Sequence, residues 1–197
     1  MSSSAHEDPG PGNAMAPTVF LLVGPPAVGK LRLARELERR IGAIVVDNHL
    51  VNNAVFVPMG LGRGGVALAD TDALRARVLD VVLEATLAAP APRSHVFTNW
   101  LPEDPENAAH VERLRTLARR RGARFVPVWL TATPEALLRR VDAPGRAERS
   151  KLTDPAILRE LLEVPAMPAP ADALGLDLTT LTPDGAVTRI LEAATAD

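Results

Sequence analysis

The stretch from residue 19 to residue 30 constrains the fold of this chain more than any other stretch. Its sequence is VFLLVGPPAVGK. The five apolar residues 19–23 are typical of a strand that is buried on both faces of a parallel sheet. Gly24 and Gly29 then frame four residues and Lys30 follows at once, which is the spacing G-x-x-x-x-G-K.

This spacing, between a strand and a helix, indicates an anion site. Glycines let the backbone curl so that successive N–H groups can point at one phosphate. The helix expected to begin near Lys30 adds partial positive charge, and the lysine adds a mobile point charge. The alternative, a glycine-rich turn with an exposed lysine, is disfavoured by the strand and helix on either side. We therefore predict that nucleotide phosphates bind to Gly24, Pro25, Pro26, Ala27, Val28, Gly29, Lys30 and Leu31.

The residue after the lysine departs from the pattern. Ser or Thr usually stands there, and its hydroxyl ligates magnesium. Here the residue is Leu31, which has no group that can ligate a metal. Magnesium would then be held by the phosphates, by water or by a carboxylate elsewhere in the chain.

Composition limits the classes of protein to consider. The 197 residues suffice for one α/β domain, and a net charge of −2 does not favour nucleic acid as a partner. The chain has no cysteine, which excludes disulfides and zinc–thiolate sites. No apolar run is long enough to span a bilayer, and residues 1–17 lack the features of a secretory signal. We expect a disordered leader over 1–17, one domain over 18–197, a cytoplasmic location, and a monomer or homodimer.

Apolar periodicity predicts five strands that alternate with helices. The expected strands span 19–23, 43–46, 95–97, 124–130 and 174–178. The expected helices span 31–41, 72–88, 106–121, 134–141, 155–163 and 183–194, with a further helix possible over 50–57. Pro127 within the fourth strand argues against full pairing on both sides at that residue.

Polar side chains follow the second and third predicted strands. In parallel α/β sheets, functional residues collect at the carboxyl ends of strands, so we expect this group near the nucleotide. Asp47 could orient or deprotonate an acceptor hydroxyl, or hold a metal through water; alternatively it only caps a helix. The others are candidates for contacts with the acceptor. Thr98 and Asn99 could instead contact a metal-bound water, and Asn99 could also only cap a loop. The predicted acceptor-side residues are Asp47, Asn48, His49, Thr98 and Asn99.

A second cationic stretch follows the fourth strand. Five cations lie in the thirteen residues 139–151, around the dipeptide Pro144-Gly145. A hinged cationic segment is suited to close over phosphates and to neutralise charge during phosphoryl transfer. We predict a short helical lid over about 140–155, although a solvated basic loop is the alternative. The expected catalytic cations are Arg140, Arg146 and Arg149, and Lys151 is expected to contact the nucleotide.

Three motifs together resemble those of one protein family. They are G-P-P-A-V-G-K, D-N-H-L and R-R-V-x-x-x-x-R-x-x-R-S-K-L-T-D-P. The chain resembles P-loop kinases of the shikimate-, gluconate- and adenylate-kinase type, and looks closest to small bacterial proteins labelled as AAA-family ATPases. The resemblance implies an α/β fold: a three-layer αβα sandwich with a five-stranded parallel sheet of order 2-3-1-4-5. It also implies ATP with magnesium, and a small-molecule acceptor.

The leading hypothesis for function is an ATP-dependent small-molecule kinase that acts on a hydroxyl group. In this hypothesis Lys30 and Asp47 are catalytic, together with the lid arginines. One alternative is a nucleotide-binding NTPase or regulator that has no acceptor. Another is a nucleoside or nucleotide kinase, although no long acceptor-binding insertion is evident. The absence of an N-K-x-D motif disfavours a GTPase switch.

Overall fold

The centre of the fold is a five-stranded parallel sheet. The computed structural model describes residues 15–141 and 154–196. Neighbouring strands pair in the order β2-β3-β1-β4-β5, and all pairs are parallel, as the resemblance implied. The strands are β1 (Thr18–Val23), β2 (Ile44–Asp47), β3 (His95–Asn99), β4 (Arg124–Thr131) and β5 (Leu174–Asp177).

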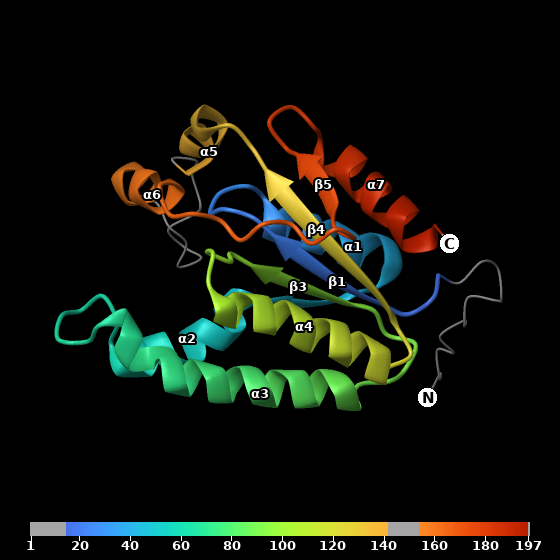
Figure 1. Ribbon diagram of the computed structural model, residues 1–197, viewed down its shortest axis with the longest axis horizontal. Helices are drawn as coiled ribbons and strands as arrows, with labels where there is room; N and C mark the ends of the chain where they lie inside the picture. Colours follow the sequence, from blue (N-terminus) through green and yellow to red (C-terminus); the bar gives the residue numbers. More distant parts are fainter. Residues whose placement is uncertain (1–14, 142–153, 197) are drawn as a thin grey trace, which may run out of the picture.

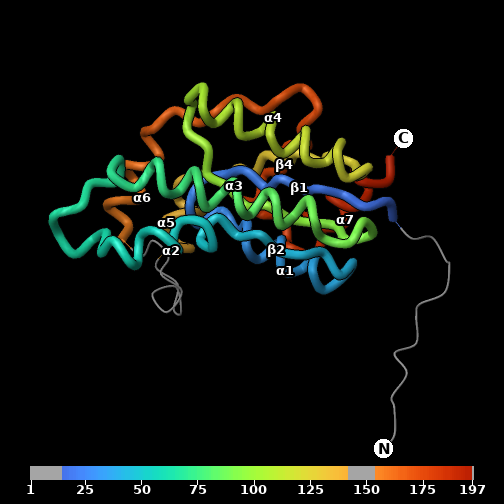
Figure 2. Tube along the Cα trace, turned by 90° about the horizontal axis from the view of Figure 1, so that it is seen from below, coloured from blue at the N-terminus to red at the C-terminus, as the bar shows by residue number. Residues whose placement is uncertain are grey.

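Helices cover both faces of this sheet, which makes three layers. Helices α1 and α7 pack together on one face, and α3 and α4 lie on the other (Figures 1 and 2). Helices α5 and α6 lie beyond the carboxyl ends of the strands (Figure 1). The helices are α1 (Lys30–Ile41), α2 (Asn48–Met59), α3 (Asp72–Ala88), α4 (Pro105–Arg120), α5 (Pro134–Val141), α6 (Pro155–Leu162) and α7 (Pro183–Thr195), with a 3-10 turn η1 (Leu68–Thr71).

Strand β1 is buried along its whole length, which explains its continuous apolar sequence. Phe20 and Leu22 point into the core formed with α1 and α7. The alternate residues Val19, Leu21 and Val23 point to the other face, into the core formed with α4. Strand β1 is therefore fixed between two layers of helices, and it fixes the start of the loop that follows it.

Most helix ends coincide with the residues expected to end or cap them. Gly42 has a φ of 63° directly after α1, in the left-handed region that glycine tolerates. The Thr182 hydroxyl accepts a hydrogen bond from the Gly185 N–H at the start of α7, as predicted. Two elements differ from the expected bounds by two residues: α2 begins and ends two residues beyond the expected 50–57, and β3 ends two residues later than expected. Strand β3 extends to Asn99, so Thr98 and Asn99 belong to the strand itself.

Pro127 lies in a strand that has neighbours on both sides. It is opposite Leu21 of β1, but β4 pairs with β5 only from Val128 onward. Pro127 therefore has no partner in β5, which agrees with the expectation that a residue without an N–H is not fully paired there.

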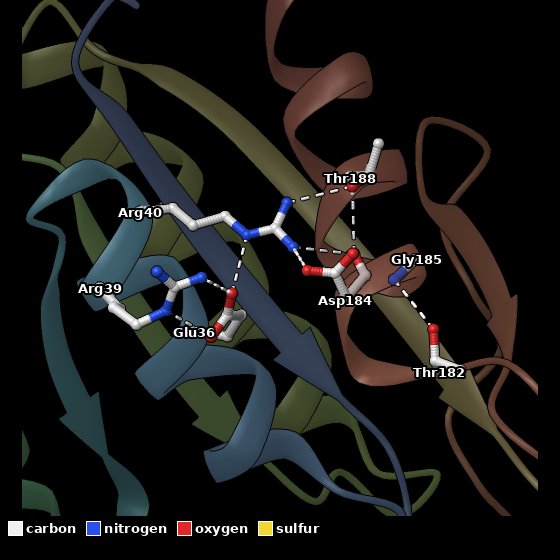
Figure 3. Close-up of polar contacts among 7 residues, drawn as sticks. All are labelled: Glu36, Arg39, Arg40, Thr182, Asp184, Gly185 and Thr188. Atoms are coloured by element: carbon white, nitrogen blue, oxygen red, sulfur yellow. Dashed lines mark hydrogen bonds and ion pairs between the residues drawn. The ribbon is translucent and has the colours of Figure 1, made fainter.

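A group of polar side chains joins α1 to α7 on one face of the sheet (Figure 3). Arg40 Nε donates to a carboxylate oxygen of Glu36 at 2.8 Å within α1. The same guanidinium bonds the Asp184 side chain and donates to the Thr188 hydroxyl of α7 at 3.1 Å. This group connects α7 to α1, the helix that follows the loop 24–29.

Parts of the predicted leader and lid lie outside the described residues. These parts are residues 1–14 and 142–153, and the second contains Arg146, Arg149 and Lys151. The Pro17 carbonyl accepts a hydrogen bond from the Arg124 N–H at 2.8 Å, so the chain joins the sheet at this point. In the described part of the chain, no helix is long and apolar enough to cross a membrane.

Candidate functional site

The loop between β1 and α1 has the backbone geometry that its glycines permit. A Cβ atom added at Gly24 would lie 2.6 Å from the Leu130 carbonyl oxygen of β4, closer than such atoms approach. Gly29 has a φ of 116°, and Ala27 adopts a left-handed φ of 66°. The loop is thus packed tightly against β4 at its start and turned sharply at its end.

The Lys30 side chain folds back across this loop. Its Nζ atom donates to the Gly24 carbonyl at 2.6 Å and to the Pro25 carbonyl at 2.9 Å. Lys30 also lines the cavity next to the loop. The ammonium group therefore lies at the loop itself, where the sequence predicted a charge for phosphate.

A cavity of about 1090 Å³ lies between the loop, the strand ends and the exposed side of α1. Of the predicted phosphate-binding residues, 26–31 line it, whereas Gly24 and Pro25 do not. Several lining residues were not predicted from the sequence, because they come from the side of α1, the end of β3 and the β5–α7 connection. These additional residues are Arg32, Leu33, Arg35, Glu36, Arg39, Trp100, Leu178, Leu181 and Pro183.

Asp47 lies at the polar end of this cavity. Its Oδ1 atom accepts from the Thr98 hydroxyl at 2.8 Å and lies 3.0 Å from His49 Nδ1. Burial would raise the pKa of Asp47, but the hydrogen bonds from His49 and Thr98 outweigh it and lower the pKa to about 2. Within the described part of the chain, all hydrogen bonds to this carboxylate go to Oδ1. Asp47 is therefore an oriented anion at neutral pH.

Asp47 also caps α2, which was the alternative weighed for it. The His49 N–H lies 3.4 Å from the same Oδ1 atom at the first turn of the helix. The Asn48 N–H contacts the Thr98 hydroxyl at 3.4 Å. The cap and the cavity position are compatible because the cap uses one oxygen of the carboxylate.

Four of the five predicted acceptor-side residues line the main cavity, namely Asp47, Asn48, His49 and Thr98. Asn99 does not line it. The Asn99 carbonyl instead accepts from the Gly24 N–H at 3.2 Å and supports the start of the loop.

A smaller cavity of about 380 Å³, lined in part by residues of α2, adjoins the main one. Arg35, Asp47 and His49 line both cavities. The smaller cavity is otherwise formed by Val45, Leu50, Asn53 and Ala54. The Asp47 carboxylate thus stands where the two spaces meet.

Arg140, which was predicted to belong to the lid, lies in α5 and lines the main cavity. Its guanidinium donates to the Val28 carbonyl at 3.3 Å and to the Leu178 carbonyl. Arg140 therefore connects the loop to the chain directly after β5.

The described residues do not provide the usual protein ligands for magnesium. Leu31 occupies the position of the metal-binding hydroxyl and lines the cavity. The two carboxylates that line the cavity are Asp47 and Glu36, and Glu36 Oε atoms bind Arg39 and Arg40. Hydrogen bonds from these arginines lower the pKa of Glu36 to about 2. Over residues 15–141 and 154–196, no three Asp, Glu, His or Cys side chains form a group that could hold a metal ion.

The fold is shared with solved kinase structures of low sequence identity. Mycobacterium tuberculosis APS kinase CysC, in complex with AMPPNP and APS, has a TM-score of 0.59 and 18% identity, and the match covers 93% of this chain and 100% of that chain. A gluconokinase from Sinorhizobium meliloti 1021 has a TM-score of 0.55 and 15% identity, with 93% of each chain covered.

A third solved structure is similar in fold at low sequence identity. It is the Deinococcus radiodurans tunicamycin resistance protein, with a TM-score of 0.57 and 16% identity, and the match covers 92% of this chain and 97% of that chain. No curated protein matches the sequence. The family model AAA_33, described as an AAA domain, matches residues 19–164. Because this match spans most of the chain, the protein belongs to the AAA_33 family of AAA domains, and its fold is that of the P-loop kinases.

Proposed function

We propose that this protein transfers the γ-phosphoryl group of ATP to a hydroxyl group of a small-molecule acceptor. The observation that carries the proposal is one cavity that contains both the phosphate-binding loop with Lys30 and the ionised carboxylate of Asp47. The first group suits a nucleotide, and the second suits a hydroxyl group. Similarity in fold to a gluconokinase and to an APS kinase supports the same reaction class.

The nucleotide would occupy the loop side of the cavity. The backbone N–H groups of 27–29 and of the start of α1 would bind phosphate oxygens, and Lys30 would turn from the Gly24 and Pro25 carbonyls toward the outer phosphates. Magnesium would reach the site with ATP, held by the phosphates and by water. The nucleotide base suits the apolar wall formed by Leu178, Leu181 and Pro183.

The acceptor would approach from the side of Asp47. A hydroxyl that donates to Asp47 is oriented to attack the γ-phosphorus, the bond from this phosphorus to the β–γ bridging oxygen breaks, ADP leaves, and the hydroxyl proton passes to the oxygens of the transferred phosphoryl group or to water. A carboxylate with a pKa of about 2 is a weak base, so we assign to Asp47 mainly an orienting role. Thr98 and His49 would hold this carboxylate in place.

Charge on the transferred group would be neutralised by Lys30, by Arg140 of α5 and by the basic residues after α5. We propose Arg140 for the loop side, because its guanidinium already reaches the Val28 carbonyl. Arg146, Arg149 and Lys151 keep their predicted role in the lid, as part of the same proposal. Stabilisation of developing charge in this way is the main source of rate in phosphoryl transfer.

A competing function is a nucleotide-binding regulator or NTPase, which the departure at Leu31 favours. The test is to incubate the full chain with ATP and a panel of sugars, nucleosides and antibiotics, and to measure ADP together with the mass of each acceptor. Acceptor-dependent ADP and an acceptor mass increased by one phosphoryl group are expected. ATP binding without any phosphorylated acceptor, or ADP formation independent of acceptor, would contradict the proposal and favour the competing function.

A further inference from the structure

The side chain next to the phosphate-binding lysine is apolar and faces the nucleotide cavity. Leu31 lines the cavity at the first turn of α1. Magnesium requires oxygen ligands in near-octahedral geometry and gives up its water reluctantly. A leucine at this position provides no oxygen ligand and occupies the place where the usual hydroxyl would stand.

The carboxylates of the cavity are already bound to other side chains. Glu36 accepts from Arg39 at 2.9 Å and from Arg40 at 2.8 Å. Asp47 accepts from the Thr98 hydroxyl and contacts His49. Neither carboxylate is part of a wider acidic group in the described residues. The cavity therefore lacks the charge distribution that attracts a divalent cation to a protein.

The same cavity is rich in cationic side chains. Among the described residues, five cations line it against two carboxylates, which leaves an excess of three positive charges. Arg32 is exposed in the first turn of α1, and it makes no hydrogen bond or ion pair with any other described residue. It is thus available to a polyphosphate. The lining cations are Lys30, Arg32, Arg35, Arg39 and Arg140.

We propose that this site neutralises nucleotide phosphates mainly with its own side chains, and that it binds the metal-free nucleoside triphosphate about as tightly as the magnesium complex. Arg32 supplies part of this charge at the start of α1. The inference rests on the proposed nucleotide site, but it concerns the binding equilibrium and not the transfer step. According to this inference, the site has no preference for the magnesium complex because Leu31 stands where a Ser or Thr would ligate the metal.

The first test measures the affinity for AMPPNP by calorimetry, once with Mg²⁺ and once with EDTA. We expect the two dissociation constants of the wild type to agree within about threefold. Leu31→Ser restores a hydroxyl and should make binding about tenfold tighter with Mg²⁺ than with EDTA. Leu31→Ala is the matched control, because it removes the leucine without adding a ligand, and it should behave like the wild type.

The second test concerns the source of the positive charge. Arg32→Ala should weaken AMPPNP binding in EDTA by about tenfold or more. The matched control is Arg120→Ala, which removes an exposed arginine of α4 that lines neither cavity, and it should leave the affinity unchanged.

Three outcomes would overturn the inference. One is a wild type that binds AMPPNP at least about tenfold more tightly with Mg²⁺ than with EDTA. Another is a pair of Leu31 variants with the same response to Mg²⁺, and the third is an Arg32→Ala affinity equal to that of Arg120→Ala. If AMPPNP does not bind under either condition, the proposed function fails as well. If it binds but no acceptor is phosphorylated, only the proposed function fails.

Discussion

The Lys30 side chain is the residue whose removal tests the loop most directly. Its ammonium lies in the cavity and bonds two loop carbonyls, so its contribution to core packing is small. We predict that Lys30→Ala weakens AMPPNP binding by at least about tenfold and abolishes measurable transfer. The melting temperature should change little. Wild-type affinity in the variant would contradict the assignment of the loop.

Asp47 can be tested with a substitution that keeps its structural role. Asparagine is as good a helix N-cap as aspartate, so Asp47→Asn should leave stability nearly unchanged. Loss of the orienting anion should lower the turnover number by about two orders of magnitude or more. A pKa near 2 also predicts that this carboxylate causes no change in rate between pH 5 and pH 8. Turnover equal to the wild type would show that Asp47 is only a cap.

At the scale of single elements, one arginine holds the end of α3. Arg121 directly follows α4, and its guanidinium donates to backbone carbonyls after and within the last turn of α3. The last carbonyls of a helix lack partners inside the helix, so a cation there stabilises it. The accepting carbonyls are those of Thr86, Leu87, Ala89, Pro90 and Arg93.

We predict that Arg121→Ala lowers the free energy of unfolding by roughly 2–4 kcal/mol, because several partly buried carbonyls lose their donor. Arg121→Lys should recover only part of this loss, since an ammonium cannot span so many acceptors. The neighbouring variant Arg120→Ala, which lies on the exposed side of α4, is the control. Urea unfolding of the three variants measures the difference, and equal stability of Arg121→Ala and Arg120→Ala would contradict this role.

Two histidines with buried ring nitrogens should make the protein sensitive to acid. Burial lowers the pKa of both His95 and His110 from 6.5 to about 4, with smaller contributions from Arg121 and Arg113 respectively. Neither nitrogen of the His110 ring has a hydrogen-bond partner among the described residues. Both side chains are therefore neutral in the folded protein at neutral pH.

The direction of the pH effect follows from these lowered values. Between pH 6.5 and pH 4 the unfolded chain binds protons that the folded protein does not bind, so the free energy of unfolding falls as the pH falls. The stabilisation is fully present above pH 6.5, and its loss amounts to roughly 1–3 kcal/mol for each histidine. Urea unfolding at pH 7 and pH 5 should show a smaller loss for His110→Leu than for the wild type. An equal loss in both proteins would contradict the prediction.

At the scale of the whole molecule, the sequence predicted the arrangement of elements better than the contacts between them. Continuous apolar runs indicate strands that are buried on both faces, and helical periodicity indicates which face of a helix is buried. The strand order followed from the family resemblance that the motifs carry. The bond from Arg140 to the carbonyl of Val28 joins residues over a hundred positions apart. The apolar wall near Leu181 and the arginines of α1 likewise depend on which helices lie side by side.

The role of Asp47 could not be decided from the residue pattern alone. The sequence allowed either a helix cap or a functional acid. In the structure both are compatible, because the described hydrogen bonds use one of two carboxylate oxygens. Asn99 illustrates the opposite case. Its position at the end of β3 was predicted, but the direction of its side chain relative to the cavity depends on packing.

Lys30 donates hydrogen bonds to the Gly24 and Pro25 carbonyls, so these carbonyls compete with any anion that binds to Lys30. An incoming anion must displace two acceptors that are tethered to the same segment and therefore present at a high effective concentration. These carbonyls are neutral, whereas phosphate oxygens form stronger, charge-assisted hydrogen bonds. Weakly charged anions such as chloride would lose this competition, and polyphosphates would win it. Because of these hydrogen bonds, we expect the loop to select ligands by their charge before any of them is recognised by shape.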